Sequence, residues 1–246
     1  MNETTVRIFH ANASNLDFIN TASVDLVVTS PPYFSVTTDK HLSGPRSSHI
    51  RYDETMADIT AFGCLLQPAF SEMYRVLKEG QILALQTKNV RYGDYLLPLA
   101  ELHSTLLLNL GFRLVARIEW IIRGINPRHK QRSNGVFRNR DTETFLVLSK
   151  GICTRSTDQS TATLFGEVSN PLWRSAPAAG IRHRFASPPQ VVRRLIALYS
   201  DTKELILDPF CGHGTIVEEA VKADRRAIGV DIDAECVRIS KKRLTC

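Results

Sequence analysis

The chain alternates short, continuous apolar runs with longer segments whose apolar residues recur at helical spacing. Residues 24–29 (VDLVVT), 81–87 (QILALQT) and 204–207 (ELIL) are runs of the first kind. Such runs are typical of strands buried on both faces of a parallel sheet. Residues 58–78 show the helical spacing. Strands that alternate with helices indicate an α/β fold with a largely parallel sheet.

The same criteria predict the remaining elements. Ser14 is predicted to cap a helical turn at 14–20, and Gly80 to end the helix at 58–78. Strands at 113–122 and 144–149 are expected to pair as a hairpin across the segment between them. Further strands are predicted at 6–9 and 227–230, and further helices at 95–110, directly after Pro188 and Pro189, at 216–223 and at 235–244.

The composition changes in the middle of the chain. Residues 123–140 hold six Arg or Lys and no acid, and residues 151–185 show little periodicity. We therefore divide the chain into an α/β part at 1–122, a small irregular basic insert at 123–186 with a strand near 142–149, and a second α/β part at 187–246.

Charge and cysteine usage limit the class of protein. The net charge of +6 suits a polyanionic partner, although a modest excess is weak support alone. The five cysteines are scattered without ligand spacing, so we expect neither a disulfide framework nor a metal site. We expect no membrane partner, because no apolar run is long enough to span a bilayer and the N-terminus lacks a signal peptide. An intracellular location is expected.

The first motif with chemical meaning is Asp208-Pro209-Phe210-Cys211-Gly212-His213-Gly214-Thr215, between a predicted strand and a predicted helix. Glycines there allow a sharp turn and close approach of a ligand. Asp231 ends the next strand, where an acid can accept hydrogen bonds from ribose hydroxyls. The loop lacks the lysine of a phosphate-binding loop and the third glycine of the dinucleotide fingerprint. It therefore favours a nucleoside cofactor without a pyrophosphate.

The second motif is Ser30-Pro31-Pro32-Tyr33, directly after the strand at 24–29. Two prolines stop the strand and fix the backbone beyond its carboxyl end, where α/β active sites lie. A rigid carbonyl and the Ser30 hydroxyl can accept hydrogen bonds from an amino group. Tyr33 offers a flat face on which a base can stack.

Together these motifs resemble a known family. Thr29–Tyr33 is similar to the catalytic motif of the amino-methylating DNA methyltransferases, and residues 208–215 resemble their S-adenosyl-L-methionine loop. The order, with the catalytic motif first and the cofactor loop last, resembles their permuted β group. The resemblance implies a circularly permuted, Rossmann-like, S-adenosyl-L-methionine-dependent methyltransferase fold that acts on double-stranded DNA.

The resemblance also assigns roles to residues. Ser30 and the carbonyl of Pro31, held by Pro32, would bind the target amine, and Tyr33 would stack on a flipped base. The implied cofactor residues are Asn12, Ser187, Pro188, Asp208, Phe210, Gly212, Gly214, Thr215, Asp231 and Ile232. Of these, Asn12 and Ile232 would lie near the adenine, Asp231 at the ribose, and Ser187, Phe210, Gly212 and Gly214 at the methionine end. Asn12 departs from the usual Gly-Asp of the family. A Cβ on Gly214 is expected to intrude on the methionine.

The basic insert is interpreted as the DNA-contacting segment, because such an enzyme must grip phosphates. Its candidate DNA-binding residues are Arg123, Arg128, Lys130, Arg132, Arg138 and Arg140. The insert is short for a complete recognition domain, which leaves homodimerisation or a further domain open.

The sequence says less about which atom of the base would receive the methyl group. In the family, serine before Pro-Pro-Tyr more often accompanies methylation of cytosine N4, which we favour over adenine N6. An RNA substrate and an idle DNA-binding subunit on the same fold also stay open. Methylation of cytosine carbon 5 is disfavoured, because no Pro-Cys dipeptide supplies the nucleophile.

Overall fold

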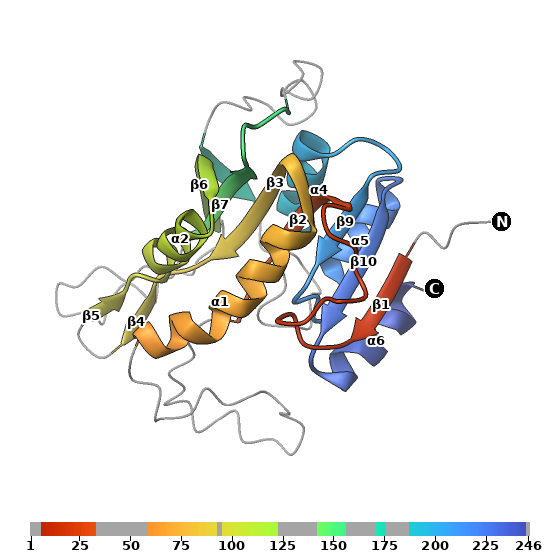
Figure 1. The fold of residues 1–246 in the computed structure, drawn as a ribbon, viewed down its shortest axis with the longest axis horizontal. Helices are drawn as coiled ribbons and strands as arrows, with labels where there is room; N and C mark the ends of the chain where they lie inside the picture. The colour runs from red at the N-terminus through yellow and green to blue at the C-terminus, as the bar shows by residue number, and fades with distance from the viewer. Residues whose placement is uncertain are drawn as a thin grey trace.

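The computed structural model describes residues 6–32, 59–92, 95–122, 142–155, 171–175 and 187–244. These residues form a central eight-stranded sheet, a separate two-stranded ribbon and five helices (Figure 1). The central strands are β1 (Val6–His10), β2 (Val24–Thr29), β3 (Leu77–Thr87), β6 (Phe112–Ile122), β7 (Thr142–Lys150), β8 (Leu172–Ser175), β9 (Leu205–Asp208) and β10 (Arg226–Asp231). The ribbon pairs β4 (Val90–Tyr92) with β5 (Tyr95–Leu97).

The strand order of the large sheet is β1-β10-β9-β2-β3-β7-β6-β8. Neighbouring strands are parallel from β1 to β3, whereas β7 runs antiparallel to both β3 and β6. The predicted α/β fold and the predicted pairing of β6 with β7 are confirmed. Strands from all three predicted segments of the chain join this one sheet.

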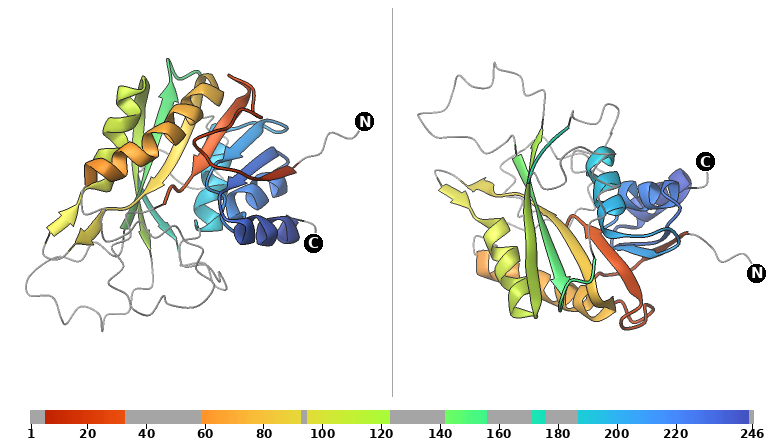
Figure 2. Two further views of the ribbon diagram at one scale, coloured as in Figure 1. Left: turned by 60° about the horizontal axis from the view of Figure 1, so that its bottom comes forward. Right: turned by 90° about the horizontal axis from the view of Figure 1, so that it is seen from above.

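Helices cover both faces of the sheet (Figure 2). One face carries α1 (Ile59–Val76) and α2 (Leu99–Asn109). The other carries α4 (Pro189–Tyr199), α5 (Thr215–Lys222) and α6 (Ala234–Leu244). All six residues of β2 are buried, because the strand is covered from both sides. The continuous apolar runs of the sequence therefore correspond to a three-layer packing.

Three local predictions were wrong. Residues 14–20 form turns rather than a helical turn, and the Asn12 side chain accepts the Ser14 backbone N–H at 3.0 Å. An Asx turn of this kind competes with helix formation. Residues 95–97 belong to β5, and α2 begins only after Pro98. Gly80 lies inside β3 with φ of 75°, at the irregularity where the pairing with β2 shifts register.

The predicted irregular segment at 151–185 also contains a strand, because β8 pairs in parallel with the end of β6. Two site predictions, on Tyr33 and on the six basic residues of the insert, fall outside the described residues. Among the helices that are described, none combines the length and apolar character needed to cross a membrane.

Candidate functional site

The two motifs meet where β9 and β2 lie side by side in the middle of the sheet. These strands pair in parallel, with Leu26 opposite Ile206 and Val27 opposite Leu207. From β9 the chain continues to β10 on one side of the sheet, and from β2 it continues to β3 on the other. Such a change of direction leaves a crevice beyond the carboxyl ends of the strands, where α/β proteins bind ligands.

A buried hydrogen bond joins the two motifs. The Thr29 hydroxyl, at the end of β2, donates to the Asp208 carboxylate, at the end of β9, over 2.8 Å. The Phe210 backbone N–H donates to the same oxygen at 3.2 Å. Burial raises the pKa of the Asp208 carboxyl to about 7, while the bonds from Thr29 and Phe210 oppose that rise. Thr29 and Asp208 thus fix the two motifs relative to each other.

Both predicted glycines have left-handed backbone conformations, with φ of 48° at Gly212 and 80° at Gly214. A Cβ added at Gly212 would meet no atom within 4 Å, so this residue borders open space. A Cβ added at Gly214 would lie 2.2 Å from the Ser240 hydroxyl oxygen on α6. A side chain at Gly214 would therefore collide with α6, and the expected clash with a methionine moiety stays a prediction.

Asp231 lies beside this loop, as the sequence predicted. Its carboxylate accepts the Gly212 backbone N–H at 2.7 Å with one oxygen and the Asp233 backbone N–H at 2.9 Å with the other. An ionised carboxylate has about four acceptor positions, so these two bonds leave capacity for hydroxyl donors. The next residue, Ile232, is 48% exposed, and its carbonyl accepts a bond from the His10 ring at 3.0 Å.

The residues that follow β2 lie directly at this edge. Ser30 and Pro32 are half-buried and Pro31 is buried. Ser30 is the residue immediately after the Thr29 that bonds to Asp208. The carboxyl end of β2 therefore brings the predicted amine-binding residues next to the predicted cofactor loop.

Ser187 and Pro188 come to the same edge from the start of α4. Pro188 is the N-cap of that helix, and both residues are buried. The Ser187 hydroxyl donates to the side-chain carbonyl of Gln86, near the end of β3, over 2.6 Å. Gln86 was missed by the sequence analysis, because a single glutamine in an apolar strand carries no local motif.

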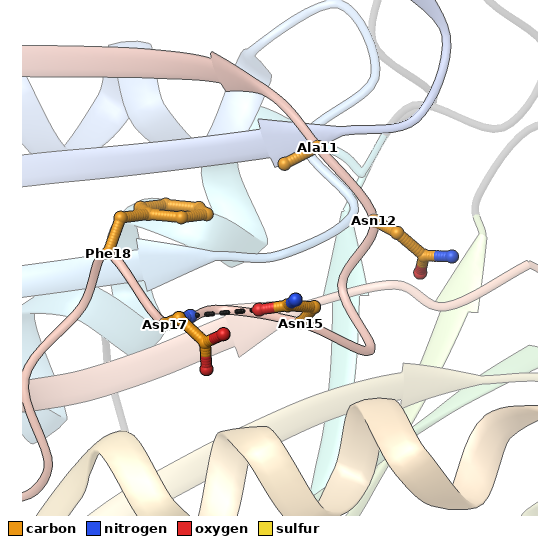
Figure 3. Close-up of a pocket in the computed structure, with 5 residues that line it drawn as sticks. All are labelled: Ala11, Asn12, Asn15, Asp17 and Phe18. Atoms are coloured by element: carbon orange, nitrogen blue, oxygen red, sulfur yellow. Dashed lines mark hydrogen bonds between the residues drawn. The ribbon is translucent and has the colours of Figure 1, made fainter.

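Asn12 lies in the loop that leaves β1. With Ala11, Asn15, Asp17 and Phe18 it lines a shallow, open depression of about 470 Å³. Figure 3 shows the loop turning back on itself, with the Asn15 side chain accepting the Asp17 backbone N–H at 3.1 Å. Phe18 is 45% exposed although its ring centroid lies 4.5 Å from that of Phe9. Asn15, Asp17 and Phe18 were not predicted.

The pKa values of two side chains in this loop, Cys211 and His213, are shifted by their surroundings. Burial raises the pKa of the Cys211 thiol well above its usual range, which disfavours the nucleophilic thiolate. Burial and the charge of Arg243 lower the pKa of His213. Over the described ranges, no three His, Cys, Asp or Glu side chains gather as metal ligands would.

The described site fits a nucleoside cofactor. Open space borders Gly212, and Asp231 retains acceptor capacity beside it. The exposed Ile232 lies directly after β10, and the depression around Asn12 lies directly after β1. These strands are adjacent, with His10 opposite Asp231, so the features form one continuous edge.

Known proteins with similar sequences are DNA methyltransferases. The DNA methylase family matches residues 24–242. A curated relative, the type II methyltransferase M.MjaI of Methanocaldococcus jannaschii, is 24% identical over 98% of this chain and 91% of its own length.

Solved structures show the same fold. The putative DNA modification methylase TTHA0409 of Thermus thermophilus, in complex with S-adenosyl-L-methionine, superposes with a TM-score of 0.72 at 24% identity, over 97% of this chain and 93% of its own. The cytosine-N4-specific PvuII DNA methyltransferase superposes with a TM-score of 0.78 at 15% identity, over 98% of this chain and 86% of its own.

Proposed function

The chain belongs to the DNA methylase family, and we propose that it methylates the exocyclic N4 of cytosine in double-stranded DNA. It is a DNA methyltransferase that uses S-adenosyl-L-methionine. The observation that carries the proposal is the position of Ser30, one residue beyond the Thr29–Asp208 bond that joins the two motifs. The fold of the cytosine-N4-specific PvuII enzyme also supports it.

The cofactor would lie along the edge described above. Asp231 would accept the ribose hydroxyls, and Ile232 and Asn12 would flank the adenine. Phe210 and the backbone of Gly212 and Gly214 would border the methionine end, with Thr215 at the start of α5. The cofactor supplies an activated methyl group together with its own leaving group, so the chain need not provide a covalent nucleophile.

The chain's own contribution is to hold and activate the amine. The lone pair of the N4 amine is delocalised into the cytosine ring. Hydrogen bonds from this amine to the Ser30 hydroxyl and the Pro31 carbonyl would favour a tetrahedral nitrogen and localise the lone pair. Orientation of the amine towards the methyl group supplies much of the rate. The proton that the nitrogen loses can pass to Ser30, to the Pro31 carbonyl or to water.

The base must leave the duplex, because the stacked and paired amine is out of reach. We propose that Tyr33 stacks on the flipped cytosine and that the basic residues of the 123–140 segment bind DNA phosphates. An intracellular, DNA-associated location follows from that substrate. A homodimer would let two copies share one DNA site.

The test is to express the chain in a host without DNA methylation and to identify modified nucleosides by mass spectrometry. We expect N4-methylcytosine, and much less of it from a Ser30→Ala variant produced at the same level. N6-methyladenine would overturn the choice of base and leave the family assignment standing. An unmodified genome beside normal cofactor binding would favour an idle subunit.

A further inference from the structure

Four polar side chains form a connected line across the carboxyl end of β3, in the order Ser187, Gln86, Glu143 and Lys88. Gln86 is only 2% exposed. Its amide oxygen accepts a hydrogen bond from the Ser187 hydroxyl at 2.6 Å, and its amide nitrogen donates to the Glu143 carboxylate. The other carboxylate oxygen of Glu143 lies 3.5 Å from the Lys88 ammonium. Burying a glutamine in an apolar strand costs free energy unless both ends of the amide are bonded, as they are here.

This line passes next to the proposed catalytic residues. In the pairing of β2 with β3, Thr29 lies opposite Leu85, so Gln86 is at the level of Ser30. Gln86 shares a sheet face with Ile82 and Ala84, which pack in the cluster beneath α4. Ser187 directly precedes Pro188, the N-cap of α4. The Gln86 amide therefore connects the start of α4 to the strand beside the amine-binding segment.

The direction of each hydrogen bond follows from the chemistry of the groups. An ionised Glu143 can only accept, so the Gln86 NH₂ group must face it and the Gln86 carbonyl must face Ser187. Because that carbonyl can only accept, the Ser187 hydroxyl must donate its single proton to Gln86. Ser187 then has only lone pairs left for any further partner. Glu143 thus determines, through Gln86, that Ser187 acts as an acceptor.

An acceptor at this position selects one of two groups at the amino-acid end of the cofactor. The α-ammonium can only donate hydrogen bonds and the α-carboxylate can only accept them. We propose that Gln86, oriented by Glu143, is a positioning residue that makes Ser187 an acceptor for the α-ammonium of S-adenosyl-L-methionine. This inference rests on the proposed placement of Ser187 at the methionine end of the cofactor.

The experiment compares two ligands that differ only at the amino-acid end. S-adenosyl-L-homocysteine carries the ammonium group, whereas 5′-methylthioadenosine lacks the whole amino-acid part and keeps the nucleoside and a thioether. Calorimetry on the full chain should show that Gln86→Leu weakens S-adenosyl-L-homocysteine binding by about 3- to 10-fold, because Ser187 keeps its lone pairs but loses the neutral hydrogen bond that holds its proton away from the ammonium. Binding of 5′-methylthioadenosine should change by less than about twofold. In turnover, KM for the methyl donor should rise more than kcat falls.

Two matched variants separate orientation from general damage. Gln86→Glu alone places two carboxylates in contact and should weaken S-adenosyl-L-homocysteine binding. Adding Glu143→Gln reverses the donor and acceptor between the two residues and leaves an acceptor facing Ser187, so the double variant should recover most of the affinity. In a Ser187→Ala background, Gln86→Leu should have little further effect.

Equal losses for both ligands would overturn the proposal, because Gln86 would then be a structural residue. Failure of the double variant to restore binding, or additive effects of the Gln86 and Ser187 changes, would overturn it as well. The identity of the methylated base does not enter these measurements. Failure of the cytosine assignment is therefore distinguishable from failure of this inference.

Discussion

The bond between Thr29 and Asp208 leads to a prediction in which the cost of one mutation depends on pH. Thr29→Val keeps the branched shape of the side chain and removes the hydroxyl that donates to Asp208. Both residues are almost fully buried, at 0% and 2% exposure, so water cannot replace the lost donor. Only the Phe210 N–H, at 3.2 Å, still reaches that carboxylate oxygen.

The size of the effect depends on whether Asp208 is ionised. Its pKa is about 7 in the folded protein against 3.8 ordinarily, so the folded state binds the proton more tightly than the unfolded state. Stability of the wild type should therefore fall as pH rises from about 4 to about 7 through this group. A hydrogen bond to a neutral group contributes about 0.5–1.5 kcal/mol and one to a charged group about 1.5–3 kcal/mol. Thr29→Val should cost about 1 kcal/mol at pH 5.5 and about 2–3 kcal/mol at pH 8.5.

The assay is urea unfolding of the wild type and Thr29→Val at both pH values. Thr29→Ser serves as the control, because it retains the hydroxyl and loses one methyl group. Its cost should be about 1 kcal/mol at either pH. A cost of Thr29→Val that is the same at pH 5.5 and pH 8.5 would refute the reasoning, since the bond would not then involve a carboxylate that ionises between them.

Three further predictions concern the ligands. Gly212→Ala should weaken S-adenosyl-L-methionine binding and cost about 1–2 kcal/mol of stability, because Gly212 has a left-handed backbone. Gly214→Ala should mainly lower the melting temperature, because its Cβ clashes with α6. Unchanged affinity of Gly212→Ala would show that the cofactor does not lie in the open space beside Gly212. Replacing the insert residues Arg128, Lys130 and Arg132 with Ala should reduce the slope of log affinity for DNA against log salt concentration by up to about one unit per lost phosphate contact. An unaltered slope would show that these residues do not contact DNA phosphates. Tyr33→Phe should retain much of the methylation rate and Tyr33→Ala should lose most of it, because stacking is worth about 1–3 kcal/mol per base; equal losses would show that the hydroxyl takes part.

The sequence was informative where burial alone decides the structure. The strand β2 has the predicted bounds, because a run buried on both faces is recognisable without knowledge of its neighbours. The pairing of β9 with β2 could be anticipated only in general terms from the α/β pattern. The Thr29–Asp208 bond, which spans 179 positions, could not be anticipated at all.

Local competition explains the errors. The 14–20 segment begins with a serine that could cap a helix, but the Asn12 side chain supplies a hydrogen bond that favours turns. A glycine after a basic residue is typical of a helix end, which is why Gly80 was predicted to end one. The positive φ that glycine allows is used here at the irregularity of β3 instead. Gln86 and Glu143 were not predicted, because their roles depend on strands that meet only in the folded sheet.

The most direct test of the account is single-turnover methyl transfer to a DNA duplex by Ser30→Ala. Removal of one hydrogen bond to the reacting amine should lower the rate by about 100- to 1000-fold. DNA affinity and S-adenosyl-L-methionine affinity should each stay within about twofold, because Ser30 is proposed to contact only the target amine. A transfer rate equal to that of the wild type would contradict the assignment of the Ser30 segment as the catalytic site.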